Sequence, residues 1–209
     1  MQANQLVASQ KTGAQLRPAA EELARAGWYR LLATLLGSPP GRDVLDLIGT
    51  LSAGPTPLGA AAEALAAAAR KAEPKALERE FTDLFIGIGE GELVPYGSYY
   101  LTGFLHERPL ARLRADLSAL GLARAEGVYE PEDGIAGLCE VMAALIDGSL
   151  DAPVPLDRQR RFFDSHLAPW ADRFFADLES AQSAAFYRHV ARLGRVIIKL
   201  ESEAFEISG

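Results

Sequence analysis

The chain has 209 residues, a formal net charge of −7, one cysteine and 49% hydrophobic residues. That length suffices for one large domain or two small ones. The acidic balance argues against nucleic acid as the main partner, because phosphate binding needs a basic field. The single cysteine, Cys139, excludes a disulfide framework and a multi-cysteine zinc site, and no apolar run reaches the roughly 18 residues of a membrane span.

The composition predicts an all-α protein. The chain contains 36 alanines and 30 leucines but only 22 valines, isoleucines and threonines together. Unbranched side chains keep more of their freedom in a helix, whereas β-branched side chains favour strands. We therefore expect a single helical-bundle-like domain of about ten helices over residues 18–209.

The first half of the chain reads as a tail followed by four helices. Residues 1–17 are polar and lack the apolar core of a signal peptide, which indicates a disordered tail on a cytoplasmic protein. Apolar residues at helical spacing then predict helices over 18–36, 42–51, 58–72 and 74–85. Proline and glycine residues separate these segments.

The helical pattern stops after residue 85. Three glycines, Pro95 and Gly97 within 87–97 forbid a continuing helix and predict a loop over 87–99. This stretch and the residue after it carry Tyr96, Tyr99 and Tyr100, half of the six tyrosines. A helix is expected over 109–120, and a second loop over 121–131.

Pro131 is expected to open the next helix, which runs to about Ile146. A proline at the first helical position lacks only an N–H that would be unpaired there, and Glu132 and Asp133 suit the positive end of the helix dipole. Further helices are expected over 156–167, 169–178 and 181–205.

The negative charge is concentrated in one segment. Residues 125–157 hold eight acids and no lysine or arginine, so the remainder of the chain is close to neutral. Such a segment is a candidate docking surface for a basic partner, although solvated surface is the simpler interpretation of its second half.

Three candidate reactive sites are weak. His106, His166 and His189 are scattered, and none follows a glutamate at the spacing of a di-iron motif. Cys139 lies in an apolar helix, where a cysteine usually behaves as a small buried hydrophobe and not as a nucleophile. The glycine-rich segment 87–92 lacks the lysine of a phosphate-binding loop and carries two glutamates. We therefore expect no catalytic residue, no metal and no cofactor.

The last predicted helix carries a basic stripe of Arg188, Arg192, Arg195 and Lys199. A solvated helix face is its plainest interpretation. Contact with an acidic partner, or with the acidic segment of this chain, is the alternative.

The two predicted loops combine rings and carboxylates. Aromatic and apolar residues of 81–100 would lie with acids such as Glu92, Glu126, Glu130, Glu132 and Asp133. Rings and carboxylates together suit a basic, partly apolar peptide, because rings contact arginine and leucine while carboxylates pair with guanidinium. Composition alone favours the simpler interpretation, in which the tyrosines pack the loops and the acids face water.

The same segments resemble the TorD/DmsD family of cytoplasmic chaperones for molybdoenzyme maturation, the redox-enzyme maturation proteins. The resemblance covers roughly residues 20–205 and rests on several ordered motifs. They are Phe81-Thr-Asp-Leu84-Phe85, Pro95-Tyr-Gly-Ser98-Tyr-Tyr100, Pro109-Leu110-Ala-Arg-Leu113-Arg114, Glu130-Pro131-Glu132-Asp133-Gly134, and Phe162-Phe163-Asp-Ser-His166-Leu-Ala-Pro169-Trp170.

The resemblance implies a non-enzymatic chaperone with two helical lobes joined by a hinge near 121–134. It implies binding of the twin-arginine leader of a molybdopterin oxidoreductase subunit, or of its apo form, so that export waits until cofactor is inserted. By matching position, the peptide site would comprise Leu84, Phe85, Tyr96, Ser98, Tyr100, Glu130, Pro131 and Asp133, with Trp28 and Tyr29 as weaker candidates.

One position departs from the family pattern, and several alternatives stay open. Gly134 stands where the family has a histidine, so no role of that side chain is carried over. A chaperone that binds the apoenzyme body without a leader, of the nitrate-reductase-assembly type, is the main alternative, and a small helical enzyme is a weaker one. A monomer and a domain-swapped dimer are both open, and we expect neither nucleic acid nor the membrane interior as a partner.

Overall fold

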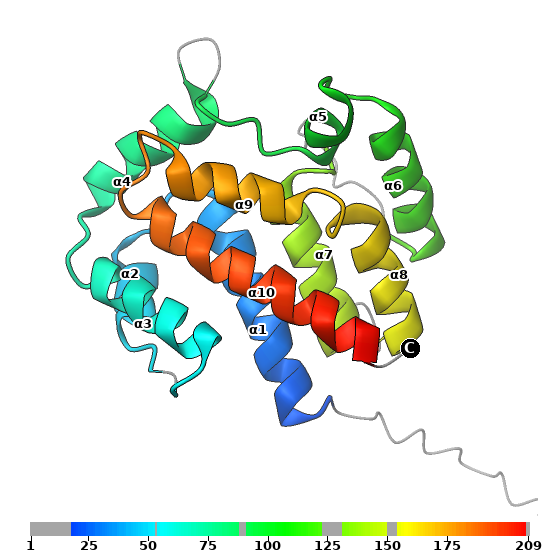
Figure 1. Cartoon of the computed structure of the whole chain (residues 1–209), viewed down its shortest axis with the longest axis horizontal. Helices are drawn as coiled ribbons and strands as arrows, with labels where there is room; N and C mark the ends of the chain where they lie inside the picture. The colour runs from blue at the N-terminus through cyan, green and yellow to red at the C-terminus, as the bar shows by residue number, and fades with distance from the viewer. Residues whose placement is uncertain (1–17, 53, 88–90, 123–130, 150–153, 208–209) are drawn as a thin grey trace, which may run out of the picture.

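The computed structural model describes residues 18–52, 54–87, 91–122, 131–149 and 154–207 (Figure 1). Regular structure in these ranges is helical, apart from an isolated antiparallel bridge between Tyr96 and Gly134. The predicted all-α class is therefore confirmed. The helices are α1 (Ala20–Gly37), α2 (Arg42–Gly49), α3 (Pro57–Ala69), α4 (Pro74–Phe81), the π-helix η1 (Thr82–Ile86), α5 (Gly97–Thr102), α6 (Arg108–Ala119), α7 (Ile135–Asp147), α8 (Leu156–His166), α9 (Ala171–Ser180) and α10 (Tyr187–Ile207).

Helices from both ends of the sequence form the centre of the molecule. In Figure 1, α10 crosses the middle with α9 beside it, and α1 packs along α7. α2, α3 and α4 lie on one side of this centre, and α5, α6 and α8 lie on the other. The predicted tail 1–17 and most of the predicted hinge, residues 123–130, lie outside the described residues.

One connected apolar core holds these helices together. Its largest fully buried side chains include Trp170, Tyr29, Tyr187, Phe163 and Phe174. Cys139 belongs to this core, and burial raises the pKa of its thiol to about 12. It is therefore a buried hydrophobe, as its apolar helix predicts.

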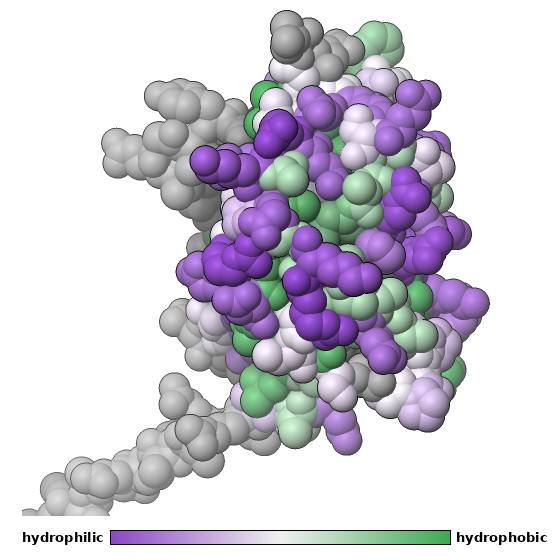
Figure 2. Space-filling view, turned by 90° about the vertical axis from the view of Figure 1, so that its left-hand side faces the viewer, coloured by the Kyte–Doolittle hydropathy of each residue, from purple (hydrophilic) through white to green (hydrophobic). Residues whose placement is uncertain are grey.

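The surface on the side of α2–α4 is mostly hydrophilic, with only small apolar areas between charged side chains (Figure 2). Among the described residues, no helix combines the length and the apolar character needed to cross a bilayer.

The fourth predicted helix does not continue as an α-helix to residue 85. The α-helix α4 ends at Phe81, and the chain widens into the π-helix η1. After residues 88–90 the backbone returns along η1, so that the N–H of Glu92 donates to the carbonyl of Asp83 and that of Leu93 to Leu84. A Cβ at Gly91 would lie 2.6 Å from the carbonyl carbon of Phe85, so only glycine allows this close approach.

Two sequence predictions at the centre of the chain are wrong. The predicted loop 87–99 gives way to helix α5 from Gly97, and Pro131 does not open α7, which starts at Ile135 with Gly134 as its N-cap. The reason is shared: residues 95–97 and 133–135 pair through backbone hydrogen bonds, and the chain before Ile135 forms a turn over 131–134 in place of a helix. Gly134 has an ordinary extended conformation and is not in the first helical turn.

The last helix also begins later than predicted. Glu92 accepts hydrogen bonds from the backbone N–H groups of Gln182 and Ser183, at 2.5 and 2.9 Å. Glu80 accepts from those of Ala185 and Tyr187, each at 2.8 Å. These carboxylates hold the chain before α10 in a turn, so the helix begins at Tyr187 and not at Ala181.

The basic stripe of α10 is largely used within the chain. Arg192 pairs with Glu179 at 2.7 Å, and Arg195 pairs with Asp172 and Glu179, both at 3.2 Å. These acids lie on α9 and not in the acidic segment 125–157. The stripe therefore ties α10 to α9.

The contact between α9 and α10 depends on Gly194, where a Cβ would lie 2.3 Å from Cε1 of the buried Phe175. We expect Gly194→Ala to lower the free energy of unfolding by about 1–3 kcal/mol, because the ring has no room to move. Gly27→Ala is the matched control: its Cβ would meet nothing within 4 Å, so helix propensity should stabilise the protein by up to about 1 kcal/mol. Urea denaturation measures both, and an unchanged Gly194→Ala would contradict the packing.

Candidate functional site

The two segments that carry the sequence signatures meet beside α5. The N–H of Gly97 donates to the carbonyl of Asp133 at 2.9 Å, and the N–H of Ile135 donates to that of Pro95 at 3.0 Å. Segments more than 30 residues apart in sequence thereby start two helices, α5 and α7, at one place.

The carboxylate of Asp133 fixes this junction. Its Oδ2 accepts a hydrogen bond of 2.6 Å from the backbone N–H of Ser98, in the first turn of α5. Both residues are buried, Asp133 at 3% exposure and Ser98 at 0%. First-turn N–H groups have no partner within their own helix, so Asp133 caps α5 from outside. Oδ1 of Asp133 and Oγ of Ser98 have no hydrogen-bond partner among the described residues.

Aromatic rings at the start of α9 pack against α5. The ring of Tyr100 lies 5.3 Å from that of Trp170 and 5.9 Å from that of Phe174, measured between centroids. Nε1 of Trp170 donates to the carbonyl of His166 at 2.7 Å, which fixes the indole at the turn between α8 and α9. The motif around Pro169-Trp170 thus forms the floor under the Tyr100 segment.

A second aromatic cluster surrounds η1. The rings of Phe81, Phe85 and Tyr187 lie 5.0–5.9 Å from one another, and the hydroxyl of Tyr187 donates to the carbonyl of Leu35 at 3.1 Å. Leu84 of η1 is itself fully buried. This cluster anchors the π-helix to α1 and α10.

The surface of α5 and the turn that follows it is apolar. Tyr99, Leu101 and Leu105 are each 42% exposed, and Phe104 is 70% exposed. We call these four residues the apolar shelf. Most other large exposed hydrophobic residues in the described ranges stand singly on different helices. Clustered exposed apolar side chains are typical of interaction sites.

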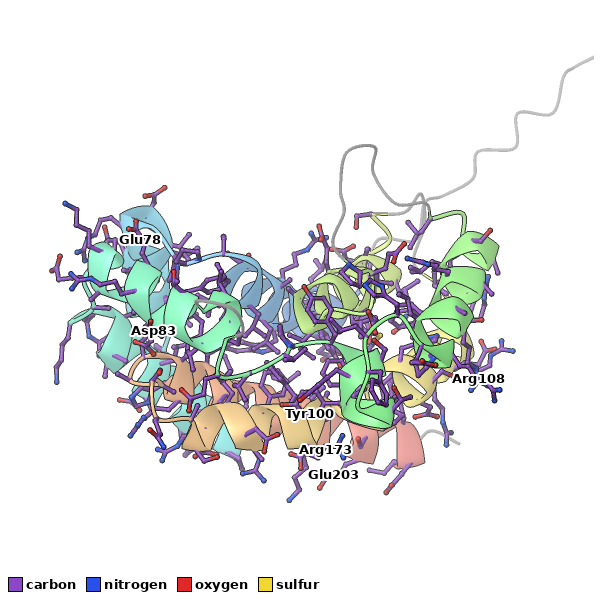
Figure 3. The ribbon with its side chains drawn as sticks, turned by 90° about the horizontal axis from the view of Figure 1, so that it is seen from above. Glu78, Asp83, Tyr100, Arg108, Arg173 and Glu203 are labelled. Atoms are coloured by element: carbon purple, nitrogen blue, oxygen red, sulfur yellow. The ribbon has the colours of Figure 1, made fainter. Side chains whose placement is uncertain are left out.

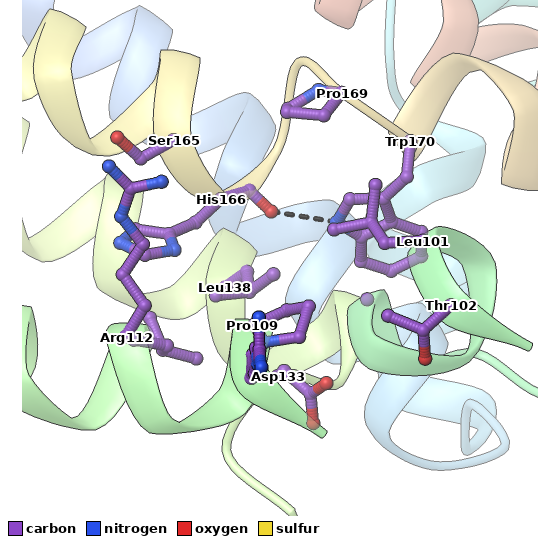
Figure 4. Close-up of a pocket in the computed structure, with 13 residues that line it drawn as sticks. Leu101, Thr102, Pro109, Arg112, Asp133, Leu138, Ser165, His166, Pro169 and Trp170 are labelled. Carbon is purple, nitrogen blue, oxygen red and sulfur yellow. Dashed lines mark hydrogen bonds between the residues drawn. The ribbon is translucent and has the colours of Figure 1, made fainter. Parts of the chain in front are cut away.

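A cavity of about 430 Å³ lies on one side of the shelf (Figure 4). Its lining includes Leu101, Arg108, Arg112, Asp133, His166 and Trp170, and we call it the arginine pocket. Figure 4 shows the Asp133 carboxylate near Pro109 and, above them in this view, the Trp170–His166 hydrogen bond.

A cavity of about 510 Å³ lies on the other side of the shelf. Its lining includes Glu92, Tyr99, Tyr100, Leu101, Arg173 and Asp177, and we call it the tyrosine pocket. The hydroxyl of Tyr100 donates to Oδ2 of Asp177 at 3.0 Å. Leu101 lines both pockets, so they meet at the shelf.

The predicted peptide-site residues occupy different depths. Leu84, Ser98, Asp133 and Tyr29 are buried. Phe85, Tyr96, Tyr100, Pro131 and Trp28 are partly exposed. Tyr100 and Asp133 line the pockets, whereas Trp28 and Tyr29 lie on α1 and line neither. Glu130 lies outside the described residues, as do Glu90 and Glu126.

In the part of the chain that the structure describes, the acids of the predicted groove have partners within the chain. Glu132 pairs with Arg114 at 3.0 Å, and Asp133 and Glu92 accept backbone N–H groups. In the rest of the acidic segment, Asp147 pairs with Arg30 and Asp157 with Arg161. In the described ranges, much of the negative charge in 125–157 therefore supports the fold.

Sequence reasoning missed Asp177 and Arg173, which complete the tyrosine pocket. They lie one turn apart on α9 and directly after the Pro169-Trp170 motif. The available signal was that Arg173 and Asp177, four residues apart, follow this motif on one face of the predicted helix. That signal could not show that α9 packs against Tyr100.

The histidines form no reactive cluster. The described residues hold no group of three or more potential metal ligands. His166 is hydrogen-bonded to Asp116 at 2.7 Å, which ties α8 to α6.

A family model described as nitrate reductase delta subunit matches residues 52–176, which is more than half of the chain and includes α5, the start of α7 and Trp170. The chain belongs to this family. The resemblance to the TorD and redox-enzyme maturation proteins is thereby confirmed.

Curated relatives agree. Two proteins named chaperone protein TorD, from the O395 and N16961 strains of Vibrio cholerae, are 28% and 27% identical to the chain over 137 residues. The match covers 62% of this chain and 62% of each relative.

A solved structure shows the same fold. It is a crystal structure of an Archaeoglobus fulgidus protein provisionally assigned as a redox enzyme maturation protein. The TM-score is 0.54 at 23% identity, and the match covers 84% of this chain and 93% of that one.

Asp133→Ala tests the junction. We expect the substitution to lower the free energy of unfolding by about 1–3 kcal/mol, because it leaves the buried N–H of Ser98 without an acceptor. Glu140→Ala, which removes an exposed acid of α7, should change it by less than about 0.5 kcal/mol. Equal effects of the two substitutions in urea denaturation would contradict the capping role.

His166 gives a pH-dependent test. Burial favours the neutral ring and lowers the pKa of His166 below its ordinary value of 6.5, which outweighs the hydrogen bond and the charge of Asp116. The unfolded chain therefore takes up this proton more readily, and stability should fall as the pH drops below about 6.5. His166→Gln should reduce this decline between about pH 6.5 and 5. Parallel stability profiles of the two proteins would contradict the assignment.

Proposed function

We propose that the chain is a chaperone of molybdoenzyme maturation, which binds the twin-arginine leader of an apo-molybdopterin oxidoreductase subunit at the surface around α5. Family membership and the chaperone names of the relatives support the general role. The observation that carries the site is the apolar shelf beside two pockets with charged side chains in their lining.

The proposed mechanism is occupancy. An apolar stretch of the leader covers the exposed shelf side chains, and its basic residues reach the carboxylate and rings of the tyrosine pocket. A leader held in this way is not available for export until the client has folded with its cofactor. Binding therefore takes place before export, which places the chain in the cytoplasm. The proposal contains no reaction and no cofactor on this chain.

A chaperone that grips the apoenzyme body is the second candidate. The family description names a subunit of nitrate reductase, which fits an association with the enzyme itself. The arginine pocket offers a suitable second contact, because Arg108 and Arg112 are exposed at its rim and suit acidic groups on a folded surface.

A matched pair of substitutions tests the shelf. Phe104 and Leu47 are 70% and 69% exposed, but Leu47 lies on α2, away from the shelf. We expect Phe104→Ser to weaken binding of a twin-arginine leader peptide by roughly threefold or more, because a ring covered in the complex is lost. Leu47→Ser should leave the affinity unchanged. Isothermal titration calorimetry measures both, and equal affinities of all three proteins would remove the shelf from the site.

Leader deletion separates the two modes of binding. A purified client subunit with and without its leader is titrated against the chain. Leader binding predicts that affinity is lost with the leader and decreases with salt, because the contact includes charge pairs. Full retention of affinity by the leaderless client would instead support the body-binding alternative.

A further inference from the structure

The tyrosine pocket already holds an arginine of the chain itself. The guanidinium carbon of Arg173 lies 5.1 Å from the centroid of the Tyr100 ring. Figure 3 shows the two side chains together, one from α5 and one from α9. This is the geometry of a cation–π contact.

Arg173 differs from the arginines that hold the fold together. Arg25, Arg114 and Arg192 each pair with a carboxylate at 2.6–3.0 Å. Arg173 makes no ion pair or hydrogen bond with its side chain to any described residue, and it is exposed. Only the ring contact holds it, and such contacts are worth about 0.5–1 kcal/mol at exposed sites.

The carboxylate that would complete a guanidinium site is present but is not used by Arg173. Asp177 lies one helical turn beyond Arg173 and lines the same pocket. Burial and the charge of Asp177 raise the pKa of Tyr100, so the hydroxyl stays protonated and donates to Oδ2 of Asp177. This hydrogen bond fixes the ring and leaves the carboxylate open to further donors.

We propose that the tyrosine pocket binds an arginine side chain of the client's basic segment, and that Arg173 occupies this position in the free chain. The inference rests on the proposed function and names the group that the pocket recognises. The client guanidinium stacks on Tyr100 and donates to Asp177, while the apolar residues beside it cover Leu101 and the rest of the shelf. Arg173 turns outward from α9 into solvent.

The chemistry favours arginine over lysine. A planar guanidinium stacks on a ring while its edge donates to a carboxylate, whereas an ammonium is a compact, strongly hydrated charge. Arg173 also sets a minimum binding strength, because any cation that enters the pocket must displace it. Basic segments that bind weakly are therefore disfavoured.

Removal of Arg173 provides the test. The probe is a synthetic peptide with two adjacent arginines followed by Phe-Leu-Leu, and a second peptide has lysines in place of both arginines. We expect Arg173→Ala to bind the arginine peptide about two- to tenfold more tightly than the wild-type protein, because the competitor and its positive charge are gone. The gain in affinity from Arg173→Ala should be smaller for the lysine peptide. Adding Asp177→Asn to Arg173→Ala should abolish the gain for the arginine peptide.

Arg158→Ala is the matched control. It removes one exposed arginine and the same charge from α8, and Arg158 lines neither pocket. Its affinity should rise by clearly less than that of Arg173→Ala. Equal rises in peptide affinity for Arg158→Ala and Arg173→Ala would show a general effect of charge. An unchanged or weaker affinity of Arg173→Ala would show that Arg173 is not a competitor. Either result overturns this inference but leaves the proposed function standing. Absence of binding by all the proteins would contradict the proposed function as well.

Discussion

The hydrogen bond from the backbone of Ser98 to the carboxylate of Asp133 is the interaction on which the proposed site depends. α5 has only six residues, too few to be stable as an isolated helix. It is held because Asp133 caps its first turn, residues 95–97 pair with residues 133–135, and Trp170 packs beneath Tyr100. The family motifs therefore have a structural role: they hold a short apolar helix in place between two pockets. In the proposed complex, the buried residues act indirectly by holding α5, and Tyr100 and the shelf contact the leader.

This arrangement changes the meaning of the charge distribution. From the sequence alone, the acidic segment 125–157 suggests a docking surface. In the described ranges, however, Glu132, Asp147 and Asp157 pair with arginines, and Asp133 is buried. Glu80 and Glu92 are likewise used to hold the turn before α10. The carboxylate left beside the tyrosines is Asp177, outside the segment that carries the excess of acids. In our proposal, recognition of a basic partner thus depends on one positioned carboxylate and a ring, and not on a diffuse negative field.

The sequence predicted the helical class and the approximate helices of the first half, because apolar periodicity and turn residues are local signals. The expectation that the two signatures share one site came from their composition and from the family resemblance. Prediction from the sequence failed where distant residues decide the backbone. α5 looks like a loop because Gly97 and the glycines and Pro95 before it hide a helix that Asp133 stabilises from 35 positions away. Pro131 looks like a helix start because the pairing of residues 133–135 with residues 95–97 is not visible locally. Arg173 and Asp177 were missed because only the path of α9 under α5 brings them to Tyr100.

Hydrogen–deuterium exchange of the chain, with and without a saturating twin-arginine leader peptide, tests the central claim most directly. Exchange reports the protection of each backbone segment on binding. If the leader lies on the surface around α5, protection should increase in peptides that cover residues 96–108 and 170–178, while α2 and α3 remain unchanged. Protection confined to other segments, with the α5 region exchanging as in the free protein, would contradict the account.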